Sequence, residues 1–84
     1  MQTAQTQGAD WFLLTEAVEK PAIKQLVPTP ISFYNLLRKN RRRLIEQGAI
    51  IKAGRAWAVS ISRAPEVIEQ IYREQTLAAL DRAA

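Results

Sequence analysis

The stretch TPISFYNLLRKNRRRLIEQGAIIKAGRAW, residues 29–57, decides the fold, because clear helix end signals are followed directly by a hairpin pattern. Thr29 can cap the free N–H groups at a helix start, and Pro30 suits the first helical position, where no N–H is needed. Gly48 suits the left-handed conformation that ends many helices. The stretch therefore predicts a helix over residues 30–47, about 27 Å long at 1.5 Å per residue.

The predicted helix has an apolar stripe, formed by Phe33, Tyr34, Leu37, Leu44 and Ile45. The opposite side is polar and carries Ser32, Asn35, Lys39, Arg42, Arg43 and Glu46. Arg41 breaks this pattern, because a continuous helix places it within the apolar stripe. Either its aliphatic stem packs while the guanidinium reaches the edge, or the helix is kinked near Asn40. We expect one continuous helix.

After the helix the pattern becomes that of a short β-hairpin. The pair Ile50–Ile51 precedes a turn at Gly54, and Trp57, Val59 and Ile61 then alternate along one face. We expect this face to close over the long helix, with Trp57 in the core.

The segments before residue 29 predict shorter elements. Trp11 and Leu13 could form a short strand beside the hairpin or anchor the chain on the core. Thr15 can cap a helix through Lys20. Residues 22–27 have apolar positions at helical spacing, enough for about two turns.

Pro65 marks the start of the last helix. Its inward stripe consists of Val67, Ile68, Ile71 and Tyr72. Leu77 and Leu80 fall off that stripe, so they could contact a neighbouring copy of the chain or belong to a frayed tail. We divide the chain into a disordered N-terminus (1–10), a folded domain (11–73) and a helical tail (74–84).

The composition excludes several classes of function. The chain has 84 residues, with no cysteine and no histidine, which removes disulfides, thiolate metal sites and the commonest general base. No spacing of the remaining acids, lysines or serines suggests a catalytic site, so we expect neither an enzyme nor a cofactor. No apolar run approaches the roughly 20 residues of a membrane span. These features predict a cytoplasmic protein with no membrane partner.

The middle of the chain is strongly basic. Residues 20–63 contain ten basic residues and a single acid, Glu46, for a net charge of +9, whereas the overall charge is +4. A solvated helix face would mix its bases with glutamate at i,i+4, and the basic run here is interpreted as unmixed. Such a block is typical of a nucleic-acid-binding face.

A basic helix followed by a basic hairpin indicates a recognition helix and a wing. On the helix, Ser32 and Asn35 would read base edges, asparagine being suited to adenine. Phosphates would be neutralised by four helix residues, Arg38, Lys39, Arg42 and Arg43. On the hairpin, Lys52 and Arg55 would reach the minor groove or its phosphates. We expect double-stranded DNA as the partner and a nucleoid-associated location.

The order of elements resembles the excisionase family of phages and mobile elements, small winged helix-turn-helix proteins also called recombination directionality factors. The likeness covers roughly residues 11–73 and is carried by Leu14-Thr15-Glu16-Ala17, by Arg43-Leu44-Ile45-Glu46-Gln47-Gly48 and by Gly54-Arg55-Ala56-Trp57, followed by an acidic C-terminal helix. The turn AIKQLVPTP and the helix before LIEQG are both longer than in the family.

This resemblance implies a mainly α winged helix-turn-helix fold with a small β-hairpin. It also implies an architectural DNA-binding role, in which neighbouring copies bend DNA and direct a site-specific integrase towards excision. Some relatives regulate transcription instead, and the sequence does not separate the two roles. A third hypothesis is a protein-interaction adaptor whose basic face binds an acidic partner.

Overall fold

Residues 10–83 are described by the computed structural model; the disorder predicted for residues 1–9 falls outside this range. The described part contains helices and one sheet, in the order β1 (Trp11–Leu13), α2 (Leu14–Ala17), α3 (Pro21–Lys24), α4 (Pro30–Lys39), α5 (Arg41–Glu46), β2 (Ile50–Ala53), β3 (Ala56–Ser60) and α6 (Ala64–Ala83). The prediction of a mainly helical domain with a hairpin is confirmed.

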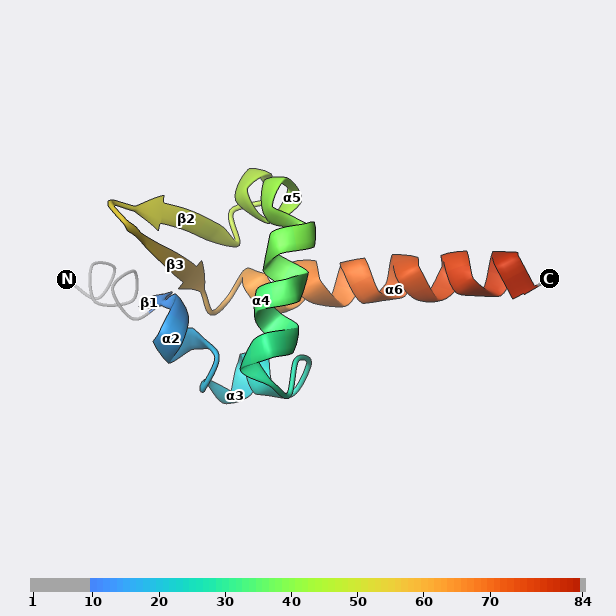
Figure 1. The fold of residues 1–84 in the computed structure, drawn as a ribbon, viewed down its shortest axis with the longest axis horizontal. Helices are drawn as coiled ribbons and strands as arrows, with labels where there is room; N and C mark the ends of the chain where they lie inside the picture. The colour runs from blue at the N-terminus through green and yellow to red at the C-terminus, as the bar shows by residue number, and fades with distance from the viewer. Residues whose placement is uncertain (1–9, 84) are drawn as a thin grey trace.

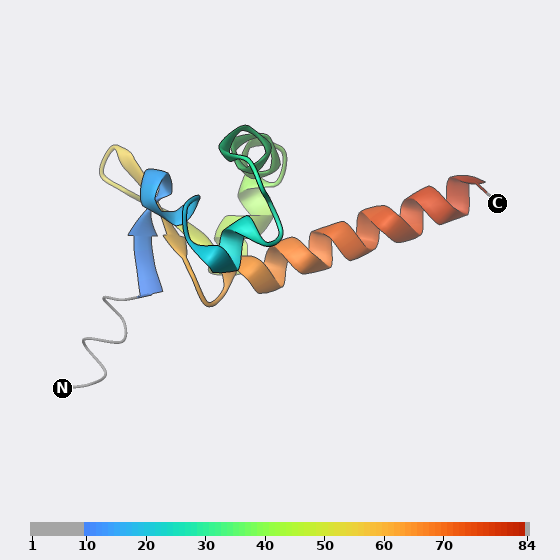
Figure 2. The same ribbon diagram turned by 90° about the horizontal axis from the view of Figure 1, so that it is seen from below.

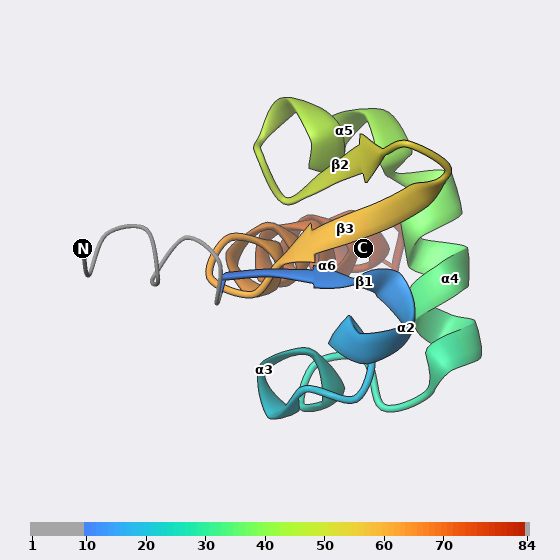
Figure 3. The same cartoon turned by 90° about the vertical axis from the view of Figure 1, so that its left-hand side faces the viewer.

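The sheet has three antiparallel strands in the order β1-β3-β2 (Figure 3). Trp11 to Leu13 pair with Ser60 to Ala58, so the strand alternative for this segment is the observed one. Gly54, with φ of +67°, makes the predicted turn between β2 and β3. The small β-hairpin of the sequence analysis is therefore two strands of a larger sheet.

The core lies between one face of this sheet and the helices. Its largest fully buried apolar side chains come from α3, α4, α5, α6, both hairpin strands and the turn after α3: Ile23, Val27, Phe33, Leu44, Ile50, Val59, Val67 and Ile68. Because every one of these elements contributes, the short helices are held by packing rather than by their own helix propensity.

The N-terminal helix is shorter than predicted and starts two residues earlier. Leu14 is its first residue, and Leu13 precedes it without a side-chain cap, so the predicted capping role of Thr15 is wrong. The helix ends at Ala17 rather than Lys20. Lys20 is extended because it precedes Pro21, which opens α3 at its first position.

Asn40 separates α4 from α5, so the single helix predicted over residues 30–47 is wrong. The backbone of Asn40 is not helical, with φ of −121° and ψ of 26°. Its Nδ2 donates to the carbonyl oxygen of Leu36 at 3.0 Å. Asparagine side chains compete in this way for backbone partners, which makes the residue unfavourable inside a helix. The helix resumes because the N–H of Leu44 donates to the carbonyl of Asn40 at 2.9 Å.

The buried stripe of these two helices is also rotated from the predicted one. Leu36 is buried beside Phe33 and Leu37, whereas Tyr34 and Ile45 are 39% and 43% exposed. Residues three and four positions apart share a helix face, and the next residue in sequence lies about 100° away. Arg41 follows the buried Leu37 by four residues, but the break at Asn40 separates the two helices and Arg41 is exposed.

Helix α6 is continuous over twenty residues, and only its first half packs on the body of the protein. Ala64, Val67, Ile68 and Ile71 are buried, whereas every described residue from position 73 onward is exposed. Figures 1 and 2 show α4 crossing the first turns of α6 and the rest of α6 projecting away from the other elements.

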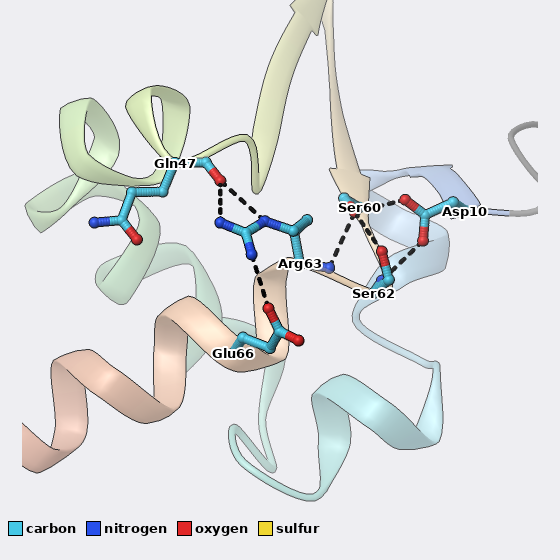
Figure 4. Close-up of polar contacts among 6 residues, drawn as sticks. All are labelled: Asp10, Gln47, Ser60, Ser62, Arg63 and Glu66. Atoms are coloured by element: carbon cyan, nitrogen blue, oxygen red, sulfur yellow. Dashed lines mark hydrogen bonds and ion pairs between the residues drawn. The ribbon is translucent and has the colours of Figure 1, made fainter.

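A polar junction fixes the corner between β3 and α6 (Figure 4). The buried hydroxyl of Ser60 donates to Oδ2 of Asp10 at 2.6 Å, and the N–H of Ser62 donates to Oδ1 at 2.8 Å. Asp10 is therefore bonded to the sheet, although the sequence analysis placed it in the disordered N-terminus. Arg63 donates twice to the carbonyl of Gln47, at 3.0 and 3.2 Å. The junction thus joins the N-terminal strand, the α5–β2 loop and the start of α6.

The junction predicts an acid-dependent loss of stability. Burial alone would raise the pKa of Asp10, but the hydrogen bonds from Ser60 and Ser62 together lower it below the ordinary value of 3.8. A depressed carboxylate pKa stabilises the fold above the unfolded-state pKa, and this stabilisation is lost as the pH falls through the folded-state pKa.

Asp10→Asn should lower the free energy of unfolding by about 1–2 kcal/mol near neutral pH. In urea unfolding, the difference between wild type and variant should shrink as the pH falls from about 5 to about 2. A difference that stays constant over this range would contradict the role given to the Asp10 carboxylate.

Candidate nucleic-acid interface

The start of α4 is built as predicted. Thr29 accepts a hydrogen bond from the N–H of Ser32 at 3.2 Å and donates one to the Ser32 hydroxyl at 2.8 Å, with Pro30 at the first helical position. One turn later, Oδ1 of Asn35 accepts a hydrogen bond from Arg38 at 2.9 Å. Ser32, Asn35 and Arg38 are all exposed, so each predicted base or phosphate contact on α4 is accessible.

These residues do not all face the same way. Ser32, Asn35 and Lys39 line a hollow of about 240 Å³ together with Tyr72 and Gln75 of α6. Arg38 and Arg42 line a different hollow, of about 760 Å³, at the α4–α5 junction. The predicted base-reading residues thus lie on the α6 side of α4, and the arginines lie on the other side.

Arg43 forms a double hydrogen-bonded ion pair with Glu74 of α6, at 2.6 and 2.7 Å. Its side chain is only 28% exposed. Hydrogen bonding to Glu74 raises the pKa of Arg43, and the same contact lowers the pKa of Glu74. Arg43 therefore joins α5 to α6, and its guanidinium is occupied rather than directed at a phosphate as predicted.

The basic run is also less free of acids than the sequence interpretation held. Nε of Arg42 donates to Oε2 of Glu46 at 2.9 Å, four residues along the same helix. The side chain of Arg42 is 90% exposed, and ion pairs at such exposed positions contribute little. A guanidinium has five N–H donors, so Arg42 retains donors for a further acceptor.

Arg41 belongs to the surface, a role that the sequence analysis missed. Its guanidinium carbon lies 5.5 Å from the centre of the Trp57 ring, and Nζ of Lys52 lies 5.6 Å from the same centre. Lys52 and Trp57 are cross-strand partners. Trp57 is half buried and packs on the core, so its predicted core position is met only in part. The ring connects α5 to the hairpin, with a cation from each.

Five exposed cations form one surface, which we call the basic face: Arg38, Arg41, Arg42, Lys52 and Arg55. Lys39, also exposed, lies outside it in the hollow beside α6. The three arginines share the junction hollow, Arg41 and Lys52 share the Trp57 ring, and Arg55 follows at the hairpin turn. Figure 2 shows α4 and the hairpin turn reaching the same, upper side of the molecule. Within residues 10–83, Glu46 is the one acid paired with a member of the face.

The described residues form neither a metal site nor a membrane-spanning helix. No group of three or more acidic, histidine or cysteine side chains could hold a metal ion there. None of the described helices combines the length and the apolar character needed to cross a membrane.

No protein-family model, curated protein or solved structure matches this chain.

Trp57 supports this face, so its removal should affect stability. We expect Trp57→Ala to lower the free energy of unfolding by about 2–3 kcal/mol, below the 3–5 kcal/mol of a fully buried ring, because Trp57 is only partly buried. Trp57→Phe should cost less, since an aromatic ring remains for Arg41 and Lys52. Urea unfolding measures both, and a change in Trp57→Ala within about 0.5 kcal/mol of zero would show that the ring does not join hairpin and helix.

Proposed function

We propose that this chain is a winged helix-turn-helix protein that binds double-stranded DNA through the basic face. The observation that carries the proposal is that the arginines of α4 and α5 share one hollow and that Arg41 shares the Trp57 ring with Lys52 of the hairpin. The backbone of α4 and the hairpin turn reach the same side of the molecule (Figure 2). A helix and a projecting hairpin on one side of a protein suit a DNA duplex. The helix can enter the major groove while the hairpin lies beside the DNA backbone.

In this arrangement the cations position the protein. Arg38, Arg41 and Arg42 would meet phosphates beside the groove that α4 enters, and Lys52 and Arg55 would meet the backbone or minor groove beyond it. Arg43 would act indirectly, by holding α5 against α6 through Glu74.

We further propose an excisionase-like role, in which neighbouring copies load on DNA and direct an integrase. The projecting half of α6 supports association between copies, because Leu77 and Leu80 are 55% and 61% exposed there. A transcriptional regulator of the same fold would use the same face, and an integrase gene beside this one would favour the recombination role.

Binding to duplex DNA should weaken steeply with salt. Five phosphate contacts correspond to a slope of log K against log salt of about −4.5, at −0.9 per contact. Fluorescence anisotropy with a labelled duplex at several salt concentrations measures this slope. A slope near zero would exclude the basic face as the main contact and favour an acidic protein partner.

Arg38→Ala combined with Arg42→Ala should reduce the steepness of this slope by about 2, because each lost phosphate contact removes about 0.9. The matched control is Arg73→Ala combined with Arg82→Ala, which removes two exposed arginines of α6. The control should keep the wild-type slope. Equal slopes for the two double variants would mean that the wrong face has been assigned.

Leu77→Ser combined with Leu80→Ser should leave binding to a single site nearly unchanged, since both residues lie away from the basic face. On DNA long enough for several copies, the variant should lose the steep, cooperative loading of the wild type in a gel-shift titration. Cooperative loading at the wild-type steepness would show that α6 does not join neighbouring copies.

A further inference from the structure

The hollow at the α4–α5 junction has an unusual lining for a basic surface. Four of its five lining residues are charged, namely Arg38, Arg41, Arg42 and Glu46, and the fifth is Ile45. Leu44, the preceding residue, is fully buried in the core. Since the next residue on a helix points about 100° away, the burial of Leu44 directs Ile45 to the surface.

A single exposed isoleucine needs no explanation on its own. Ile45 differs from such a residue by its position, because it lies among the three arginines that form the helical part of the basic face. Guanidinium groups attract phosphates, whereas an apolar side chain gains nothing from a charged oxygen. Ile45 would therefore meet an uncharged part of a nucleotide.

Base edges in the major groove present hydrogen-bonding groups, with one apolar exception, the 5-methyl group of thymine. We propose that Ile45 is a specificity-determining residue that packs on a thymine methyl while the surrounding arginines meet the backbone. This inference rests on the proposed DNA-binding function and adds the base that the junction hollow recognises.

Glu46 does not prevent this arrangement. Its carboxylate is paired with Arg42 at 2.9 Å, and this pairing reduces the repulsion between the carboxylate and a nearby phosphate. Both side chains are well exposed, so the pair can rearrange at little cost when DNA arrives.

The test removes one methyl group at a time. A tight-binding duplex is first selected from a short random-sequence pool with the wild-type protein, and each thymine is then replaced singly by uracil. At one thymine, the replacement should weaken wild-type binding about fourfold, the change expected from one buried methyl-sized group. Ile45→Ala should bind the thymine and uracil duplexes equally, with an affinity near that of wild type for the uracil duplex.

Ile51→Ala is the matched control, because Ile51 is also an isoleucine with 43% exposure but lies on strand β2 outside the hollow. It should keep the fourfold discrimination, and Ile45→Val, which retains a branched apolar side chain, should keep most of it. Unfolding midpoints of all variants check that each is folded.

The inference is overturned if wild type binds every uracil duplex as tightly as the thymine duplex, or if Ile45→Ala still discriminates. In both cases salt-dependent binding to the selected duplex would persist, and the proposed function would stand. Failure to enrich any sequence would overturn the inference alone, whereas failure to bind any duplex at low salt would overturn the proposed function as well.

Discussion

The direction of the chain at Asn40 is the constraint on which the candidate interface depends. The Asn40 side chain bonds back to the Leu36 carbonyl, and its backbone leaves the helical conformation for one residue. Helix α5 therefore starts afresh, with Leu44 in the core, Arg43 at Glu74 of α6 and Arg41 at the Trp57 ring of the hairpin. The Asn40 side chain, by interrupting the helix, thus sets the positions of these three contacts of α5.

These contacts separate the charges of the molecule. Arg43 and Arg63 are paired with Glu74 and Glu66 of α6, close to where that helix meets the rest of the fold. Within the described residues, Arg38, Arg41, Lys52 and Arg55 form no ion pair. Arg43 and Arg63 therefore serve the fold, and the cations on the opposite side of α4 and on the hairpin remain accessible to a polyanion.

Local signals predicted three ends of elements, although not those of the first helix. Thr29 and Pro30 start α4, Gly48 has the positive φ that ends α5, and Gly54 turns the hairpin, because each effect depends on the residue's own backbone or its next neighbours.

Contacts between distant parts of the chain were not predictable in the same way. Glu74 lies 31 residues after Arg43, and no spacing rule connects them. Arg41 was misplaced for a different reason: Tyr34 and Ile45 were taken as inward and Leu36 was overlooked, which rotated the stripe onto Arg41. The break at Asn40, which starts α5 afresh at Arg41, also takes Arg41 off the face that Leu37 occupies. DNA binding itself stays a prediction that the basic face supports.

The most direct test of the central claim is to map the contact surface by NMR. Amide signals of uniformly ¹⁵N-labelled protein would be followed while a short duplex is added. The account predicts that the largest shifts fall on Arg38, Arg41, Arg42, Lys52 and Arg55, with the described residues beyond position 76 unaffected. Shifts concentrated on the projecting half of α6, or no shifts at all at low salt, would contradict it.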